Sequence, residues 1–344
     1  MDAAIRNPPN ARIAVVTGGN KGIGIEVCRQ LAGAGITVVL TARDEKRGTS
    51  AAEKLREAGL SGVIFHQLEI TDAPSIARLA DFLKTRFGKL DILVNNAAIG
   101  AVEYVHDPAD GSLSSEEKFS GMDRQQRLEW MFNAVRETYD SAREGVQINY
   151  YGTKHVIEAL LPLLQASSDG RIVNVSSDAG LLRVTYFDHA LIPTRRLLLQ
   201  FPIGPDQFSL AKISFPTQHI RNEELKRELS DIDSLTEERL DEVLDTFLKD
   251  FKAGDLEERR WPIVISAYKM AKVALNAYSR MLARTHPELR VNCVHPGYVD
   301  TDMTMHSGPL TPEEGAANVV KVALLPEGGP TGAYFALGQE AQFV

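Results

Sequence analysis

Short apolar runs alternate along the chain with longer segments in which apolar residues recur every three or four positions. The runs are a few residues long and rich in Val, Ile and Leu, as is typical of strands buried in a parallel sheet. The longer segments, such as 76–87 with Ile76, Leu79 and Leu83 on one face, have the spacing of amphipathic helices. The runs predicted to be strands are 13–17, 37–41, 63–68, 90–95, 171–175, 290–294 and 333–336.

This alternation predicts an α/β fold with a doubly wound parallel sheet, the Rossmann arrangement. No repeat and no linker-like stretch divides the chain, so a single domain is expected over 11–344. Helices are predicted at 25–34 and over a long stretch from about 124 to 164, broken near Gly145.

A helical insertion is predicted at 181–265. Its segment 240–251 carries apolar residues along one helical face, and Ser234 with Glu237 has the spacing of a capping box. Such a helix must bury its apolar face against the rest of the domain. It could form one wall of a substrate pocket or merely decorate the surface.

Within this insertion, the segment 184–220 has apolar residues without a steady period and four prolines. Val184 requires a codon that begins with GT, and 214–218 can be encoded by a pyrimidine-rich tract that ends in CAG, which are the two edges of an intron. One hypothesis is a translated retained intron or a gene-model error, for which poor packing is expected. Messages that span the segment uninterrupted would contradict it, and the alternative is a lid that contacts an apolar substrate.

Composition and charge exclude several classes of protein. The 344 residues carry a net charge of −8 without a basic run, which argues against nucleic acid or an anionic membrane as partner. Two distant cysteines, Cys28 and Cys293, imply no disulfide framework and favour a reducing compartment. Residues 1–10 are polar, and no run approaches the ~18 apolar residues of a membrane span, so a cytoplasmic protein is expected.

A glycine-rich turn, Gly18 to Gly24, directly follows the first predicted strand and precedes a predicted helix. Glycines in this context let the backbone approach a pyrophosphate, and the helix N-terminus offers free N–H groups. The spacing is Gly-x-x-x-Gly-x-Gly rather than Gly-x-Gly-x-x-Gly, and an ordinary tight turn is the alternative interpretation.

The residues that follow the second predicted strand favour NADP over NAD as the cofactor. NAD sites place an acidic residue near the end of this strand, but Ala42 and Arg43 stand here. Arg43 and Lys21 could together neutralise a 2′-phosphate, which favours NADP. The alternative is that Arg43 is an ordinary solvated surface residue.

Tyr268 and Lys272 lie four residues apart in a segment rich in helix formers. Residues at this spacing share one helical face, and a neighbouring ammonium favours the phenolate. The pair could therefore exchange a proton near neutral pH. The pattern is weak when it stands alone, and other motifs strengthen it.

These motifs together resemble the short-chain dehydrogenase/reductase family, and in particular its plant carbonyl reductase-like branch. The resemblance covers nearly the whole chain and follows the order of the family's motifs. It is carried by Thr17-Gly18-x-x-x-Gly22-x-Gly24, Asn95-Asn96-Ala97, Asn149, Ser177, Tyr268-x-x-x-Lys272 and Pro296-Gly297. Ala98 and Glu69 depart from the family pattern, which usually has Gly and Asp there, and both changes are conservative.

The resemblance implies four catalytic residues. Tyr268 would protonate a carbonyl oxygen, Ser177 would hydrogen-bond it, and Asn149 would hold a water in a proton relay. Lys272 would lower the pKa of Tyr268 and bind the nicotinamide ribose. The cofactor-binding residues implied are Gly18, Asn20, Lys21, Gly22, Ile23, Gly24, Arg43, Glu69, Asn96, Tyr268, Lys272, Pro296, Gly297, Val299 and Thr301, the last for the carboxamide.

The sequence thus predicts an NADPH-dependent carbonyl reductase that transfers hydride to a small apolar ketone or aldehyde, plausibly a terpenoid or alkaloid. Some relatives in the branch reduce a carbon–carbon double bond and lack the tyrosine, so Tyr268 favours a carbonyl. A monomer is implied because the insertion covers the surface through which short members dimerise. A dinucleotide-binding sensor without turnover and a reductase inactivated by its insertion remain alternatives.

Other polar residues are not given a chemical role. His66, His155 and His295 lack the spacing of metal ligands, and no metal site is predicted. Cys293 is expected to be an inert buried thiol. Asn95 and Asn96 are expected to brace the sheet beside the cofactor.

Overall fold

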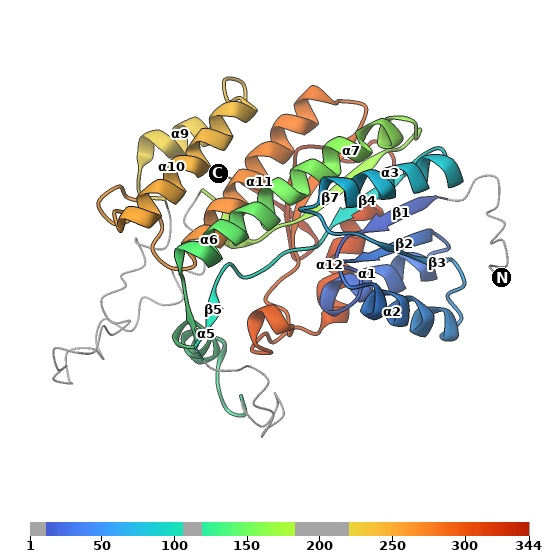
Figure 1. Cartoon of the computed structure of the whole chain (residues 1–344), viewed down its shortest axis with the longest axis horizontal. Helices are drawn as coiled ribbons and strands as arrows, with labels where there is room; N and C mark the ends of the chain where they lie inside the picture. Colours follow the sequence, from blue (N-terminus) through green and yellow to red (C-terminus); the bar gives the residue numbers. More distant parts are fainter. Residues whose placement is uncertain (1–11, 106–118, 183–219, 344) are drawn as a thin grey trace.

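The computed structural model describes residues 12–105, 119–182 and 220–343 (Figure 1). A sheet in the order β10-β9-β8-β7-β4-β1-β2-β3 runs through the molecule, and all pairs are parallel except β9 with β10. Its strands are β1 Ile13–Val16, β2 Thr37–Ala42, β3 Val63–Gln67, β4 Ile92–Asn95, β7 Arg171–Val175, β8 Arg290–His295, β9 Tyr334–Ala336 and β10 Gln339–Ala341. The predicted strands and the doubly wound parallel sheet are confirmed, and β10 is an addition.

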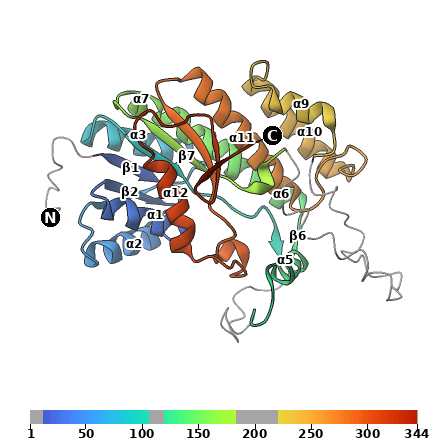
Figure 2. The ribbon, with the colours of Figure 1, turned by 180° about the vertical axis from the view of Figure 1, so that it is seen from behind.

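Helices cover both faces of the sheet (Figures 1 and 2). One layer holds α1 Gly22–Gly33, α2 Glu45–Glu57 and α12 Pro312–Ala323, and the other holds α3 Ala73–Arg86, α7 Thr153–Gln165 and α11 Ser266–Thr285. Each layer has its own apolar core against the sheet, and Val15 and Val16 of β1 belong to different cores because successive side chains point to opposite faces.

The order of the strands creates a crevice. The chain runs outward from β1 to β3 and then returns to β4 on the other side of β1. Helices therefore leave the neighbouring strands β1 and β4 toward opposite faces, which opens a gap beyond their carboxyl ends. In doubly wound folds this is where ligands bind.

The long helix predicted over 124–164 is broken, but not near Gly145. It consists of α5 Arg124–Asn133, α6 Tyr139–Val146, a π-helix Gln147–Gly152 and α7, and β6 Val135–Arg136 pairs with β5 Glu103–Tyr104 in the gap. Thr138 caps α6, because its side chain accepts a hydrogen bond from Ser141 N. Gly145 lies inside α6, and a Cβ there would lie only 2.2 Å from the Ala101 Cβ, so glycine allows Ala101 to pack closely against this helix.

The insertion contributes α9 Glu223–Ser230 and α10 Glu237–Ala253, and α10 lies beside α6 and α11 (Figures 1 and 2). An ion pair between Glu228 and Arg239 joins α9 to α10. The apolar face of α10 is buried as predicted, with Phe247 packed edge-on against Trp261 at 5.5 Å. Buried Lys154 of α7 adds ion pairs to Glu237 at 2.9 Å and to Asp241 at 3.3 Å. The insertion is thus tied to the domain by both apolar and charged contacts.

The predicted capping box at Ser234 is wrong. Thr236 caps α10, because its side chain accepts a hydrogen bond from Arg239 N, while Ser234 donates to Asp231 Oδ2. Two hydroxyl side chains stand two residues apart, and the one with extended backbone directly before the helix becomes the cap. The atypical segment 184–220 lies outside the described residues, apart from Ile220, which is buried in the core.

Candidate active site

The glycine turn lies at the carboxyl end of β1 and requires glycine at particular positions. Gly18 and Gly22 have φ values of +64° and +54°, which other residues rarely adopt. A Cβ at Gly24 would lie 2.2 Å from the Gly18 carbonyl oxygen and 2.6 Å from Asn96 Nδ2. Asn20 and Lys21 lie in the turn before α1, and Ile23 lies in the first turn of α1.

This turn leaves the N-terminus of α1 available to an anion. Lys21 precedes the helix and does not cap it with its side chain. The first N–H groups of a helix have no partner within the helix, so together with the helix dipole they favour a phosphate. The turn therefore fits the pyrophosphate of a dinucleotide.

Hydrogen bonds join the glycine turn to the end of β4. Thr17 Oγ1 accepts from Asn96 N at 2.9 Å and from Ala97 N at 3.0 Å, and Asn96 Nδ2 donates to the Thr17 carbonyl at 3.0 Å. Asn95 Nδ2 donates to Asn174 Oδ1 at 2.8 Å, which links β4 to β7. The two asparagines brace the sheet, as predicted.

The cations expected at a 2′-phosphate have carboxylate partners in this structure. Arg43 lies at the end of β2 with its side chain 74 % exposed, 3.8 Å from Glu69. Lys21 pairs instead with Asp302, from the loop after β8. Both cations can reach solvent, but they are held by different segments.

The loop after β8 closes the other side of the glycine turn. It carries Pro296, Gly297 with a φ of +104°, Val299 and Thr301. A methyl group of Thr301 would lie 3.3 Å from a Cβ at Gly22, so this loop and the glycine turn are in contact. The structure thus brings together cofactor residues predicted from opposite ends of the chain.

Tyr268, Ser177 and Lys272 meet where β7 ends and α11 begins. The side chains of Ser177 and Tyr268 are close enough for Ser177 to lower the pKa of Tyr268. Lys272 lies behind them, with Nζ 5.7 Å from the centre of the Tyr268 ring, and donates a hydrogen bond to the Val175 carbonyl at 2.8 Å. The predicted i, i+4 geometry is present, since both residues lie in one helix.

The expected lowering of the Tyr268 pKa by Lys272 is not found. Burial raises the pKa of Tyr268, and the Ser177 side chain offsets this only in part. Burial also lowers the pKa of Lys272 to about 8, and its amino group is directed at a backbone carbonyl. In the protein alone, Tyr268 is therefore a protonated acid.

Asn149 lies in the π-helix, a geometry that often marks functional sites. Its Oδ1 accepts from Ile99 N at 2.8 Å and its Nδ2 donates to the Ile99 carbonyl at 2.9 Å. Because both ends of the side-chain amide bind Ile99, the amide holds the loop that follows β4.

A carboxylate beside Ser177 was not identified from the sequence. Asp178 Oδ1 accepts a hydrogen bond from the hydroxyl of Tyr334 at 2.7 Å, and its Oδ2 lies 3.6 Å from His295 Nε2. Burial and this carboxylate raise the pKa of Tyr334. In the sequence, the only signal for Asp178 was its position directly after Ser177. Its partners on β8 and β9 come close to it only in the folded sheet.

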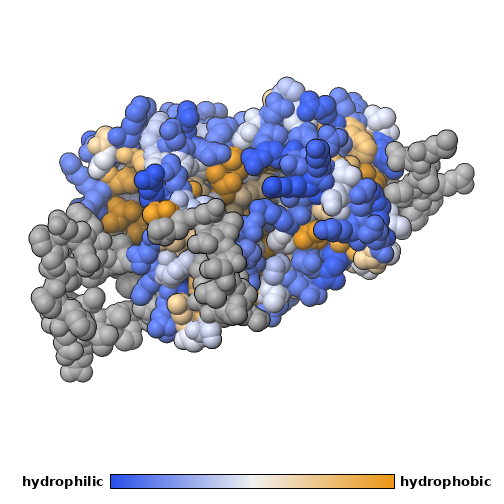
Figure 3. Space-filling model, turned by 60° about the horizontal axis from the view of Figure 1, so that its bottom comes forward, coloured by the Kyte–Doolittle hydropathy of each residue, from blue (hydrophilic) through white to orange (hydrophobic). Residues whose placement is uncertain are grey.

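Several large apolar side chains are exposed on the surface of the protein. Tyr104, Val105 and Met122 are among the few large apolar residues exposed in the described chain. Tyr298 from the loop after β8 donates a hydrogen bond to the sulfur of Met131 in α5 at 3.5 Å. Figure 3 shows apolar residues gathered in patches on a face that is otherwise mostly hydrophilic.

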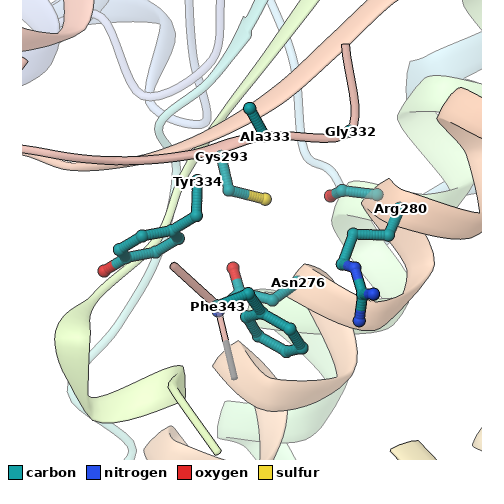
Figure 4. Close-up of a pocket in the computed structure, with 8 residues that line it drawn as sticks. Asn276, Arg280, Cys293, Gly332, Ala333, Tyr334 and Phe343 are labelled. Carbon is teal, nitrogen blue, oxygen red and sulfur yellow. The ribbon is translucent and has the colours of Figure 1, made fainter. Parts of the chain in front are cut away.

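Behind α11 lies a cavity of about 10 Å³, lined by Asn276, Arg280, Cys293, Tyr334 and Phe343 (Figure 4). It has room for little more than one water and cannot hold a substrate. Arg280 lies over the Phe343 ring, 4.9 Å from its centre, so the end of the chain covers this side of the helix.

The two free thiols are buried. Burial raises the pKa of Cys293 to about 11 and also raises that of Cys28, so neither is a nucleophile. This agrees with the inert thiol predicted at Cys293. In the described ranges no group of His, Cys, Asp and Glu side chains is arranged to hold a metal, and no helix is long and apolar enough to cross a membrane.

We expect Gly24→Ala to weaken dinucleotide binding by roughly tenfold or more, because the new methyl group would collide with the glycine turn. Gly33→Ala is the matched control, since a Cβ there meets no atom within 4 Å. Fluorescence titration with the dinucleotide measures both variants. Equal affinity for the Gly24 variant and the wild type would contradict this account of the turn.

We expect the unfolding free energy of the cofactor-free protein to rise between about pH 8 and 10.5, relative to that of Lys272→Met. The folded-state pKa of Lys272 lies below its ordinary value of 10.5, so the unfolded chain binds more protons in this window. Urea denaturation at several pH values measures the difference. The exposed Lys249→Met control should follow the wild type, and parallel curves for all three proteins would refute the lowered pKa.

Comparisons with known proteins agree with this site. The family profile described as short chain dehydrogenase matches residues 12–188. Short-chain dehydrogenase/reductase 1 of Saponaria officinalis is 43% identical over 335 residues, covering 96% of each chain, and (+)-neomenthol dehydrogenase of Arabidopsis thaliana is 43% identical over 336 residues, covering 96% of this chain and 98% of the relative. The structure of salutaridine reductase from Papaver somniferum is 42% identical, covers 94% of this chain and 99% of its own, and superposes with a TM-score of 0.75. The chain belongs to the short-chain dehydrogenase/reductase family.

Proposed function

We propose that this protein is an NADPH-dependent carbonyl reductase that reduces a small apolar ketone or aldehyde, with Tyr268 as proton donor. The observation that carries the proposal is that Ser177 and Tyr268 interact through their side chains beside the buried Lys272. This cluster lies at the carboxyl edge of the sheet, on the side where the glycine turn fits a dinucleotide.

The cofactor and the protein side chains would contribute different parts of the reaction. A bound nicotinamide cofactor supplies the hydride. Ser177 and Tyr268 donate hydrogen bonds to the carbonyl oxygen, whose negative charge grows as hydride arrives, and Tyr268 then transfers its proton. The raised pKa of Tyr268 keeps that proton in place at neutral pH, which suits the reductive direction.

The resulting phenolate needs stabilisation, and Lys272 and Ser177 are the groups nearest to it. The ammonium of Lys272 lies 5.7 Å from the ring, and its pKa of about 8 leaves it mostly charged at pH 7. A carbonyl substrate therefore meets a protonated acid whose conjugate base is stabilised after transfer. Asn149, in the π-helix, holds the loop after β4 in place through its two hydrogen bonds to the backbone of Ile99.

The cofactor preference for NADP rests on charge at the end of β2. Arg43 stands after the strand, where an acidic residue would favour NAD, and it is exposed toward solvent. A guanidinium matches the geometry of a phosphate, and Lys21 can add charge if it leaves Asp302. The exposed apolar residues Tyr104, Val105 and Met122 support an apolar substrate.

The insertion supports a monomeric enzyme. The helix α10 covers α6 and α11, and Leu240, Leu244 and Phe247 are completely buried there. A second copy could not pack its own helices onto surfaces that α10 already occupies. The intact Ser177–Tyr268 contact favours turnover over a role as a dinucleotide sensor, which would not need the acid.

We expect the wild type to oxidise NADPH in the presence of cyclic ketones, and Tyr268→Phe to lower kcat by ~10²–10⁴-fold through loss of the acid. Absorbance at 340 nm measures the reaction. Tyr278→Phe is the matched control, because Tyr278 is buried in the same helix away from Ser177. Tight NADPH binding without turnover of any ketone in the wild type would instead favour a sensor or a damaged enzyme.

We expect Arg43→Ala to raise the KM for NADPH by roughly tenfold and to leave that for NADH nearly unchanged, since only NADPH carries the 2′-phosphate. Lys54→Ala, which removes an exposed cation from the other end of α2, should change neither value. Equal effects of Arg43→Ala on the two cofactors would argue against a phosphate contact.

A further inference from the structure

The catalytic helix α11 begins without a cap of its own. Ile265 precedes it in a left-handed conformation, with a φ of +44°, and its apolar side chain cannot accept a hydrogen bond. The first N–H groups of a helix need partners from elsewhere when they are buried, and Ser266 is completely buried. Tyr268 lies in this first turn, so whatever holds the turn also sets the position of the phenol.

Glu137 supplies the missing partner from a distant part of the sequence. Its Oε1 accepts hydrogen bonds from Ser266 Oγ at 3.0 Å and from Ala267 N at 3.1 Å. A carboxylate at a helix N-terminus is further favoured by the helix dipole. Burial raises the pKa of Glu137, and the donors of Ser266 and Ala267 and the charge of Lys269 oppose this effect.

We propose that Glu137 is a positioning residue for the reaction, because it caps the catalytic helix from outside and so fixes Tyr268 against Ser177. The inference rests on the proposed reductase function. Glu137 itself contacts neither the reacting groups nor the glycine turn, so it would act on the reaction only through the position of α11.

Glu137 is itself held by the small two-stranded sheet of β5 and β6. It follows β6 directly, and the next residue, Thr138, donates a hydrogen bond to Glu103 Oε1 at 2.7 Å. Arg136 donates two more to Glu103 Oε2, at 3.0 and 2.8 Å. The same pair of strands carries the exposed residue Tyr104, so this exposed side chain and the first turn of α11 share one anchor.

A cap in this place should affect the rate more than cofactor binding. Misplacement of a catalytic group by about 1 Å can lower the rate by ~10²-fold. The glycine turn lies on other elements, β1 and α1, and does not depend on the first turn of α11. Loss of the cap should therefore lower kcat and leave the KM for NADPH unchanged.

The test compares Glu137→Ala, which removes the acceptor, with Glu137→Gln, which keeps one. We expect the alanine variant to lose roughly 10- to 100-fold in kcat with the KM for NADPH within about twofold, and the glutamine variant to retain most of kcat. Asp140→Ala is the control, since it removes a nearby acidic side chain that is 84 % exposed. Hydrogen exchange of the α11 first turn should be faster only in the alanine variant.

Several results would overturn the proposal. They are a full kcat in Glu137→Ala, an equal loss in Glu137→Gln, or unchanged hydrogen exchange in the alanine variant. If Glu137→Ala does not fold, Glu137→Met fills the same space without an acceptor, and failure of both to fold would assign Glu137 to stability alone. Absence of turnover in the wild type would refute the reductase function instead, and hydrogen exchange would still decide whether Glu137 holds the helix.

Discussion

The close packing of the turn after β7 against α11 is the constraint on which the site depends. A Cβ at Gly180 would lie 2.7 Å from the backbone of Lys272, and Asn276 Nδ2 donates to the Gly180 carbonyl at 3.0 Å. Ser176 Oγ donates to Asn276 Oδ1 at 2.7 Å, so the strand end is fixed to the helix by polar contacts inside the core. Ser177 and Tyr268 can meet only because these two elements approach so closely.

Much of the fold could be predicted because its signals are local. Buried parallel strands are continuous apolar runs, and the glycine turn stands between a strand and a helix, so both could be recognised without tertiary information. The i, i+4 spacing of Tyr268 and Lys272 likewise placed them on one helical face. The family's motifs then indicated Ser177 and Asn149, which no local pattern identifies.

The predictions that failed depended on burial or on contacts between distant segments. The electrostatic effect of Lys272 on Tyr268 was overestimated because the sequence does not show how deeply both are buried, or that the ammonium faces Val175. The break in the helix after α5 follows from pairing of β6 with β5, which lies some thirty residues earlier. Glu137 and Asp178 find their partners only through the topology of the sheet and its helices.

The two thiols give the molecule a pair of internal reporters. Cys28 lies beneath the glycine turn, with its sulfur 3.0 Å from where a Cβ at Gly19 would stand, and Cys293 lies in β8 behind α11. Because both are buried and protonated at neutral pH, a thiol reagent can reach each only when its surroundings open. Labelling rates would thus report separately how often the glycine turn and α11 leave their native packing.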